Sequence, residues 1–473
     1  MSYQVPQHID KNKIFIVKRS EIEGRLDPKM ALHNRNVQNW AYPKVRLKDI
    51  LLVKPQYGAA ESGIARTNLR SPRYIRITDI DEYGLISHDD LGATANTVEE
   101  QYILHQNDLL IARSGATVGK AYIHKDCPYT CFFAGYLIRF VINPIKALPD
   151  YIFAFTQSNT YKEWVSAIQR PSGQPNINAE EYQSLEIPMP PIDIQERVVS
   201  IIRTAYSEKQ NKDLQAQQLL DSIDTYLLDE FGISLPEVHN ELKDRIFILN
   251  RSELEGRLDP TVYKDGIKLI SPKWDNVKLS KVAYINLGGA YKGKSPDMPI
   301  SFVPMEVVDE TFSEIITMGE TTIAQSSGFT KFREGDLLWA KITPCMQNGK
   351  SAIARNLING LGCGSTEFFV MRPKDDRLAI EYLHVVLHMK CVRKTAMLYF
   401  GGSAGQQRVP SSYLENFDLP LPPKEKQMEI AHHVYDLRQR AKTLREEGKR
   451  VLEEAKQNVE LMALNGDKNN NMG

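Results

Sequence analysis

One peptide occurs twice in this chain, and this repeat constrains the fold more than any other feature. "RSEIEGRLDP" begins at Arg19 and "RSELEGRLDP" begins at Arg251, 232 residues later, and the copies match at nine of ten positions. The length of the match argues against chance. The second copy argues against a cleavage sequence left by an expression vector. We therefore interpret the pair as part of an internal duplication, which defines the architecture of the whole chain.

Three further pairs of segments extend the duplication. They are "KVRLKDI" (44–50) with "NVKLSKV" (276–282), "NDLLIARSGATVGKAYI" (107–123) with "GDLLWAKITPCMQNGKSAI" (335–353), and "LEIPMPPIDIQERV" (185–198) with "FDLPLPPKEKQMEI" (417–430). Each half then has one order: an opening peptide, a body of short apolar segments punctuated by Gly and Pro, a Pro-Pro pair and a long helix. The pattern predicts an α+β body of roughly 150 residues, present twice.

Each Pro-Pro pair precedes a helix with an apolar seam at coiled-coil spacing. The seam residues are Val198, Ile202, Ala205, Leu219 and Ile223 in the first helix, and Ile430, Val434, Leu437, Leu444 and Val451 in the second. Lys209 and Lys212 interrupt the first seam. Each helix should run for roughly 35 residues, about 50 Å. The two seams can bury each other as an antiparallel pair; the alternative is that each helix packs on its own body.

The expected fold class is α+β, with two similar globules separated by two long antiparallel coiled-coil helices in a pseudo-two-fold internal repeat. The expected divisions are a first globule with an N-terminal arm (1–192), a first spacer helix (193–235), a second globule (236–424), a second spacer helix (425–466) and a disordered tail (467–473).

Composition sets limits on the class of protein. The chain has 59 basic and 59 acidic residues, so it lacks the net positive charge common in nucleic-acid binders, although a local basic surface remains possible. It has no long apolar run and no apolar core of a signal peptide near its start, so we expect no membrane contact and a cytoplasmic location. The five cysteines suit reduced thiols, and "CPYTC" alone has poor spacing for zinc, so no metal site is expected.

No set of residues forms a recognisable catalytic motif. "GATVGKA" (115–121) resembles a phosphate-binding loop, but it has three residues between its glycines instead of four and Ala121 where Ser or Thr is needed. It and its counterpart "MQNGKS" are expected to be strand–turn–strand hairpins in which Gly119 and Gly349 supply positive φ. "PEVHNELK" (236–243) and the two "RLDP" aspartates have nothing nearby to complete a site. We expect no catalytic residue in this chain.

Several segments carry side chains that can contact DNA, through phosphates or base edges. The candidates are Lys54, Arg66, Arg70, Arg73, Arg76, Arg113, Ser114, Lys120, Arg170, Ser172, Gln174 and Asn176 in the first half, and Lys341, Gln347, Asn348, Lys350, Ser403, Gln406, Gln407 and Arg408 in the second. The alternative for each loop is a solvated turn with no partner. Two such loops lie at equivalent places ahead of the Pro-Pro pairs, which favours a shared role.

The combined pattern resembles the specificity (S) subunit of type I restriction-modification systems. The resemblance rests on "VRLKDI", "DLLIARSGATVGKAYI", "SGQPNINAEEYQSLEIPMPPIDIQERV" and "FDLPLPPKEKQMEIAHHVYDL", and spans nearly the whole chain. It implies that each globule is a target-recognition domain reading one half of a split site in double-stranded DNA. It also implies that the helices serve as a spacer and as a docking surface for two methyltransferase (M) subunits, with restriction (R) subunits added.

By this resemblance the chain holds no cofactor itself, and S-adenosylmethionine, ATP and magnesium belong to the partner subunits. The second half departs from the pattern, because it replaces "SGATVG" with "ITPCMQNG" and lacks "QPNIN". Contacts by Arg113, Ser114 or Asn176 are therefore not carried over to it. Two other functions remain open: a tandem protein–protein adaptor on a coiled-coil rod without DNA binding, and a stand-alone nuclease or methyltransferase.

Overall fold

The computed structural model describes Ile16 and residues 28–36, 40–87, 90–169, 175–235, 260–402 and 406–466. Most of both repeated opening peptides (residues 19–27 and 251–259), "PEVHNELK" and the tail 467–473 lie outside the described residues. The chain forms two compact units: unit 1 comprises Met1–Asn211 and Glu447–Gly473, and unit 2 comprises Lys212–Glu446. Compactness thus divides the chain differently from the predicted domains, because each unit includes part of both long helices.

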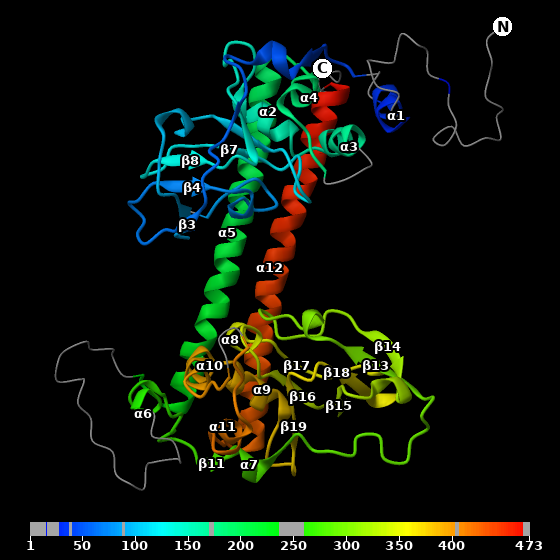
Figure 1. Cartoon of the computed structure of the whole chain (residues 1–473). Coiled ribbons are helices and arrows are strands. Elements are labelled where there is room, and N and C mark those ends of the chain that lie inside the picture. The colour runs from blue at the N-terminus through cyan, green and yellow to red at the C-terminus, as the bar shows by residue number, and fades with distance from the viewer. Residues whose placement is uncertain are drawn as a thin grey trace, which may run out of the picture. The chain divides into compact units, whose positions relative to one another are not determined.

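Unit 1 contains two four-stranded sheets and a two-stranded one (Figure 1). In sheet order the strands are β2 (Gln56–Tyr57), β9 (Leu137–Phe140), β6 (Leu109–Ala112) and β7 (Ala121–Ile123); β3 (Ile64–Ala65), β5 (Ala93–Thr94), β4 (Arg73–Ile75) and β8 (Cys131–Phe133); and β1 (Lys44–Arg46) with β10 (Glu186–Pro188). The helices of its body are α1 (Pro28–Asn36), α2 (Pro149–Phe155), α3 (Asn159–Ile168) and α4 (Ala179–Gln183). The apolar run of β6 is buried at all four positions, as expected for a central strand.

Unit 2 repeats this plan. Its strands, in sheet order, are β12 (Ala283–Ile285), β19 (Phe368–Pro373), β16 (Leu337–Ala340) and β17 (Ser351–Ile353); β14 (Gly319–Thr322), β13 (Pro299–Val303), β18 (Leu361–Gly364) and β15 (Thr330–Arg333); and β11 (Asn276–Lys278) with β20 (Asp418–Pro420). The helices of its body are α6 (Pro260–Asp265), α7 (Leu279–Val282), α8 (Cys345–Asn348), α9 (Ile380–His388), α10 (Lys390–Met397) and α11 (Ser411–Glu415). In both units one pair of strands is parallel, β4 with β8 and β13 with β18.

Six short 3₁₀ turns connect these described elements. They are η2 (Leu47–Ile50), η3 (Ile77–Asp79), η4 (Glu100–Tyr102), η7 (Met305–Val307), η8 (Ala324–Ser326) and η9 (Ile358–Gly360).

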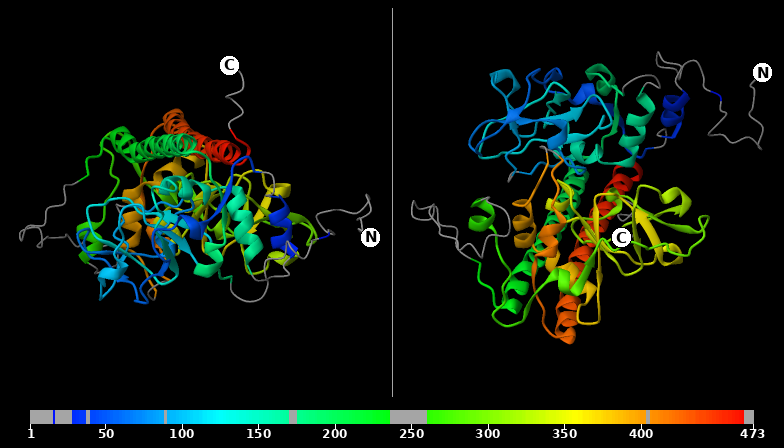
Figure 2. Two further views of the ribbon diagram at one scale, coloured as in Figure 1. Left: turned by 90° about the horizontal axis from the view of Figure 1, so that it is seen from above. Right: turned by 60° about the horizontal axis from the view of Figure 1, so that its bottom comes forward.

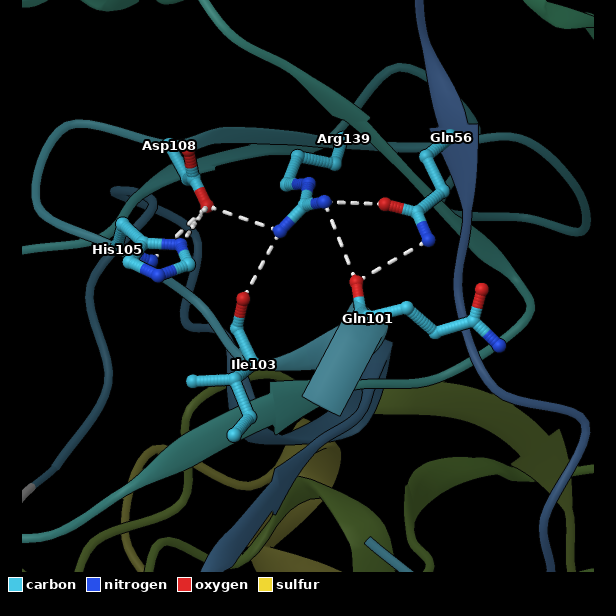
Figure 3. A network of polar contacts seen from close by, with 6 residues as sticks. All are labelled: Gln56, Gln101, Ile103, His105, Asp108 and Arg139. Atoms are coloured by element: carbon cyan, nitrogen blue, oxygen red, sulfur yellow. Dashed lines mark hydrogen bonds and ion pairs between the residues drawn. The ribbon is translucent and has the colours of Figure 1, made fainter. Parts of the chain in front are cut away.

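A buried carboxylate holds an arginine of the neighbouring strand in each unit. In unit 1, Arg139 on β9 contacts Asp108 at 3.4 Å and donates to surrounding carbonyl and amide oxygens (Figure 3). In unit 2, Arg372 on β19 holds Asp336 through two hydrogen bonds of 2.6 and 2.7 Å. Burial raises the pKa of Asp108, although a backbone N–H and Arg139 oppose the rise. The repeated pair is framework, because it fixes the strand that leads into the candidate interface.

A buried glutamine joins each Pro-Pro pair to its body. Gln427 accepts the Ala379 N–H at 2.8 Å, just before α9, and donates to Pro422 O at 2.8 Å and to a second carbonyl at 2.7 Å. In unit 1, Gln195 accepts an N–H just before α2 and donates to a Pro-Pro carbonyl, both at 2.9 Å. Each amide side chain therefore fixes the start of a long helix against a helix of the body.

The two long helices are α5 (Ile192–Phe231) and α12 (Lys424–Asn465). The predicted first helix extended to residue 235, four residues too far. Gly232 ends it: its φ is +67°, its N–H bonds to Asp229 O at 3.1 Å, and the next N–H bonds to Leu228 O at 2.9 Å. This pair of bonds is a Schellman motif, which closes a helix at a glycine with left-handed backbone.

Within each unit, α5 lies beside α12 and runs antiparallel to it (Figure 2). In unit 1, Val198 and Ile202 share a core with Val459, and a Cβ added at Gly448 would lie 3.3 Å from the Lys209 side chain. In unit 2, Lys426 pairs with Glu230 at 3.0 Å, and Arg445 donates to Gln217 at 3.2 Å. In both units the residue number rises along one helix as it falls along the other.

The predicted seam holds over part of each helix. Val198, Ile202, Ala205, Ile223, Ile430, Val434 and Leu437 are buried, whereas Leu219, Leu444 and Val451 are half-buried. Toward the end of α12 the buried face shifts by one residue, to Leu452 and Val459. A straight helix has 3.6 residues per turn and therefore drifts away from a strict seven-residue repeat. Lys209 places its ammonium 4.5 Å from the Tyr83 ring, which explains how a lysine is tolerated in the seam.

Candidate nucleic-acid interface

Two predicted DNA-contacting segments, far apart in the sequence, lie side by side in unit 1. The segment after β6 pairs with the segment ahead of α4: Ile177 N donates to Arg113 O at 2.8 Å, and Gly115 N donates to Pro175 O at 3.0 Å. Ser114 and Asn176 are bridge partners within this pairing. We call these two segments the paired loops. Half-buried Arg113 and exposed Asn176 are thereby brought to one place.

Unit 2 forms paired loops on the same backbone plan. Val409 N donates to Lys341 O at 2.9 Å, Thr343 N donates to Gln407 O at 3.0 Å, and Ile342 is the bridge partner of Arg408. The second half lacks the motif "QPNIN", although a loop at the equivalent place was predicted from the sequence, and the backbone pairing now fixes the register of that loop. Arg113 thus corresponds to Lys341, and Asn176 corresponds to Arg408. The framework is shared and the side chains differ.

A third segment, the turn before β9 or β19, completes the paired loops and was missed from the sequence. Arg113 N donates to Tyr136 O at 3.0 Å, and Lys341 N donates to Glu367 O at 2.9 Å. The side chain of Tyr136 is 65% exposed, so its ring is accessible from solvent. Glu367 instead accepts two hydrogen bonds from Arg408, at 2.9 and 2.8 Å. These bonds hold the pKa of Glu367 below its usual value, although partial burial opposes the shift.

The sequence did contain a signal for this turn. "GYL" and "TEF" each separate two short apolar segments at comparable places in the two halves. An alignment of the halves strand by strand would have placed Tyr136 and Glu367 opposite each other.

Arg113 is held between the body and the surface. Its guanidinium lies 5.0 Å from the centre of the Tyr57 ring, and among the described residues its Nε has no hydrogen-bond partner. An arginine can stack on an aromatic face and still offer its planar set of N–H donors to an acceptor. The position suits an arginine that contacts an external acceptor.

Two candidate residues, Arg66 and Arg73, are buried, and their prediction as DNA contacts is corrected here. They are only 2% and 0% exposed. Arg66 donates to backbone carbonyls, including Ser71 O at 2.9 Å. Counting basic residues could not separate these two buried side chains from exposed ones. Lys120 and Lys350 are half-buried and donate to Ile80 O and to Met305 O, the latter at 3.1 Å, and they remain predictions.

The other candidates remain predictions in differing surroundings. Lys54, Arg70 and Gln406 are exposed and Gln407 is half-buried. Arg76 is bound by Asp79 through hydrogen bonds of 2.8 and 3.1 Å. The Asn348 side chain donates to Glu310 at 3.1 Å, and the backbone carbonyl of Gln347 accepts a hydrogen bond from Arg393 at 2.5 Å. Arg170, Ser172, Gln174 and Ser403 lie outside the described residues.

The phosphate-loop resemblance is absent from the fold. In unit 1 the segment is a turn between β6 and β7, and Gly119 has a φ of +87°, as predicted. In unit 2, Gly349 also has positive φ, at +93°, but the connection is not the expected simple hairpin, because it contains the short helix α8.

No helix in the described part of the chain is both long and apolar enough to cross a membrane.

Comparison with known proteins decides the family. The family model described as "Type I restriction modification DNA specificity domain" matches residues 83–219 and 272–454, more than half of the chain. The chain belongs to this family. One matched stretch lies in each half of the chain and includes part of the body and of the long helix of that half. The family model therefore matches twice, once in each copy of the internal duplication.

Individual relatives are similar over different shares of the chain. The type I restriction enzyme EcoEI specificity subunit of Escherichia coli is 37% identical over 164 residues, which cover 33% of this chain and 26% of that protein. The EcoAI specificity subunit is 35% identical and likewise matched over 26% of its length. The EcoKI specificity subunit of E. coli strain K12 is 21% identical over 77% of this chain and 74% of its own length.

A solved structure shows the same fold. It is described as "Structural basis underlying complex assembly and conformational transition of the type I R-M system", and its chain aligns with a TM-score of 0.51 at 16% identity, covering 91% of this chain and 99% of that chain.

Proposed function

We propose that this chain is the sequence-specific DNA-binding subunit of a type I restriction-modification system, with each unit reading one half of a split site. The observation that carries the proposal is that each unit has one set of paired loops. The backbone pairing of the two sets is the same and their side chains differ. A shared backbone suits a common mode of docking on the duplex, and different side chains suit different base sequences.

The two sets of paired loops offer different readout chemistry. Unit 1 presents Arg113, Asn176 and the exposed ring of Tyr136. Asparagine can pair with adenine and arginine with guanine through two hydrogen bonds each. Unit 2 presents Lys341 and an Arg408 whose fork already binds Glu367. The two half-sites should therefore differ in sequence.

The long helices suit the roles of spacer and docking surface. Their antiparallel contacts within each unit support a coiled coil between α5 and α12. We propose that two methyltransferase subunits dock on this rod and bring S-adenosylmethionine, and that restriction subunits bring ATP and magnesium chemistry. This chain then contributes target selection and no catalytic group.

The test removes one charge at a time from the complex with its methyltransferase. Arg113→Ala and Lys341→Ala should each weaken binding to the duplex site about tenfold and lower the slope of log K against log salt by about one. Arg355→Ala is the matched control. Arg355 pairs with Glu381 and follows β17. It lies at the open end of the β16–β17 hairpin, whereas Lys341 lies at the other end, so the loss of Arg355 should change affinity less than twofold.

Three results would contradict the proposal. One is equal weakening by all three substitutions, which would indicate a general charge effect. Another is a complex whose assembly is independent of salt and that binds no duplex, which would favour the adaptor function. The third is a chain that methylates DNA by itself, which would show that it is an enzyme.

A further inference from the structure

Unit 1 gathers three side chains of a kind that bind soft metal ions. A ring nitrogen of His124 and the sulfur atoms of Cys127 and Cys131 all lie within 4.8 Å of one another, and the two sulfurs are 3.4 Å apart. Two thiolates bound to one tetrahedral zinc ion, at bonds of about 2.3 Å, lie about 3.8 Å apart. The sulfurs therefore need to move by only a few tenths of an ångström to share an ion.

The third ligand stands just ahead of the two cysteines, in "HKDCPYTC" (124–131), and reading "CPYTC" alone missed it. His124 follows β7, and Cys131 begins β8 in the other four-stranded sheet of the unit, so the connection between the two strands folds back on itself. Tyr122 Oη lies 3.0 Å from His124 Nδ1 and restrains the ring, as outer hydrogen bonds do for metal-bound imidazoles.

Fixed positive charge lies beside the thiols. Arg73 is the bridge partner of Cys131 across the parallel β4–β8 pair and is fully buried. Its Nη1 contacts Tyr129 Oη at 3.3 Å, while its Nε and Nη2 have no partner among the described residues. The Arg66 guanidinium stacks 4.2 Å from the same ring. Guanidinium groups in this position favour thiolates, the form that binds metal.

Burial opposes the ionised form. It raises the pKa of Cys131, and Cys127 adds to the rise, whereas the two arginines lower it. A metal site is therefore supported by its geometry, because the three donor atoms lie within 4.8 Å of one another.

Unit 2 shows that the fold itself does not require polar residues here. Ala354 has the backbone contact of His124. Ala354 N donates to Asp336 O, just before β16, as His124 N donates to Asp108 O, just before β6, both at 2.8 Å. Gly362 takes the place of Cys131 in the parallel strand pair. Apolar or small residues thus fill the equivalent space in one unit, so the cluster in unit 1 is a local addition.

We propose that His124, Cys127 and Cys131 form a binding site for a thiophilic divalent ion, zinc in the first instance, with its fourth position open to water or another ligand. Binding of M²⁺ releases the two thiol protons and forms two metal–sulfur bonds and one metal–nitrogen bond, with no redox change. Cys127 is only half-buried, which gives the ion a path from solvent. The ion would pin the β7–β8 connection to the start of β8.

The test measures metal in the purified full-length chain, in complex with its methyltransferase. Elemental analysis should give about one zinc ion per chain, and cobalt(II) added to metal-free protein should give the intense visible absorption of a tetrahedral site with thiolate ligands. Cys127→Ser and His124→Ala should each remove most of the zinc and the cobalt absorption. Cys363→Ser, at a buried thiol of unit 2, is the control and should keep both.

Thiol reactivity gives a second readout that does not depend on a variant folding. Zinc should slow the reaction of two cysteines of the wild-type chain with a thiol reagent, and a chelator should restore it. Three results would overturn the proposal. They are a zinc content of the wild type no higher than that of Cys127→Ser, zinc that survives both ligand substitutions, or a disulfide between Cys127 and Cys131 located by peptide mass mapping of the wild type.

Discussion

Replacing Gln427 with alanine tests how the body fixes the start of the long helix. The side chain is fully buried and makes three hydrogen bonds, of 2.8, 2.8 and 2.7 Å, to backbone groups of two segments. Its removal leaves one N–H and two carbonyls without a partner. Each orphaned buried group costs about 1–3 kcal/mol. Because water can reach some of them, we expect a total loss of about 3 kcal/mol.

The assay is denaturant unfolding of the full chain, followed by circular dichroism. For a unit of this size, about 3 kcal/mol corresponds to a fall in melting temperature of about 6–12 °C. Gln195→Ala should cost a similar amount in unit 1. Gln217→Ala is the control, because Gln217 also makes hydrogen bonds but is exposed on α5. It should change the free energy of unfolding by less than about 0.5 kcal/mol.

A charged variant adds the dependence on pH. In Gln427→Glu the new carboxylate faces two carbonyl oxygens, so its pKa is raised in the folded state. The folded state then binds a proton more readily than the unfolded state, so stability is highest below the pKa of an unfolded glutamate and is lost as pH rises from there through the raised pKa of the folded state. We expect Gln427→Glu to be less stable than Gln427→Ala at neutral pH and to recover on acidification. Equal stability of Gln427→Ala and Gln217→Ala would refute this account of the junction.

Three further predictions concern the readers and the spacer. Glu367→Gln frees Arg408, so affinity for non-specific duplex should rise and the salt slope should steepen by about one; an unchanged slope would show that Arg408 does not contact phosphate. Tyr136→Ala should weaken specific binding about tenfold while Tyr136→Phe keeps most of it, because the ring makes the contact; equal effects would assign the role to the hydroxyl. Inserting one heptad into both helices, after Asn211 and after Glu446, should lengthen the half-site spacing by about 10 Å, or about three base pairs. A constant spacing in the methylation pattern would show that the helices do not set it.

Local patterns predicted much of the framework. Two features have causes that lie within a few residues. The apolar runs of β6 and β16 reflect burial, and the glycines at the tight turns adopt a positive φ that other residues disfavour. The long helices were predicted from their seams. The error at the end of α5 arose because Gly232 was not read as a stop signal.

The candidate site depends on contacts that the sequence does not encode locally. Asn176 meets Ser114 across 62 residues, and only the folded backbone shows that Arg408 occupies the equivalent place in unit 2. Arg66 and Arg73 belong to a basic segment of the sequence but lie inside the unit. Arg66 donates to a backbone carbonyl and stacks on the Tyr129 ring, and Arg73 contacts the Tyr129 hydroxyl. His124, by contrast, stands only three residues before Cys127, so this cluster was visible in the sequence and was missed because "CPYTC" was read alone.

The claim that two units read two half-sites is tested most directly by exchanging one reader. Residues 44–192 would be replaced by the equivalent segment of a family member that recognises another sequence, leaving α5, α12 and unit 2 unchanged. Methylated adenines would then be mapped across a genome that carries the complete complex. We predict that one half of the recognised sequence changes while the other half and the spacing stay the same. A change in both halves, or in neither, would contradict the account.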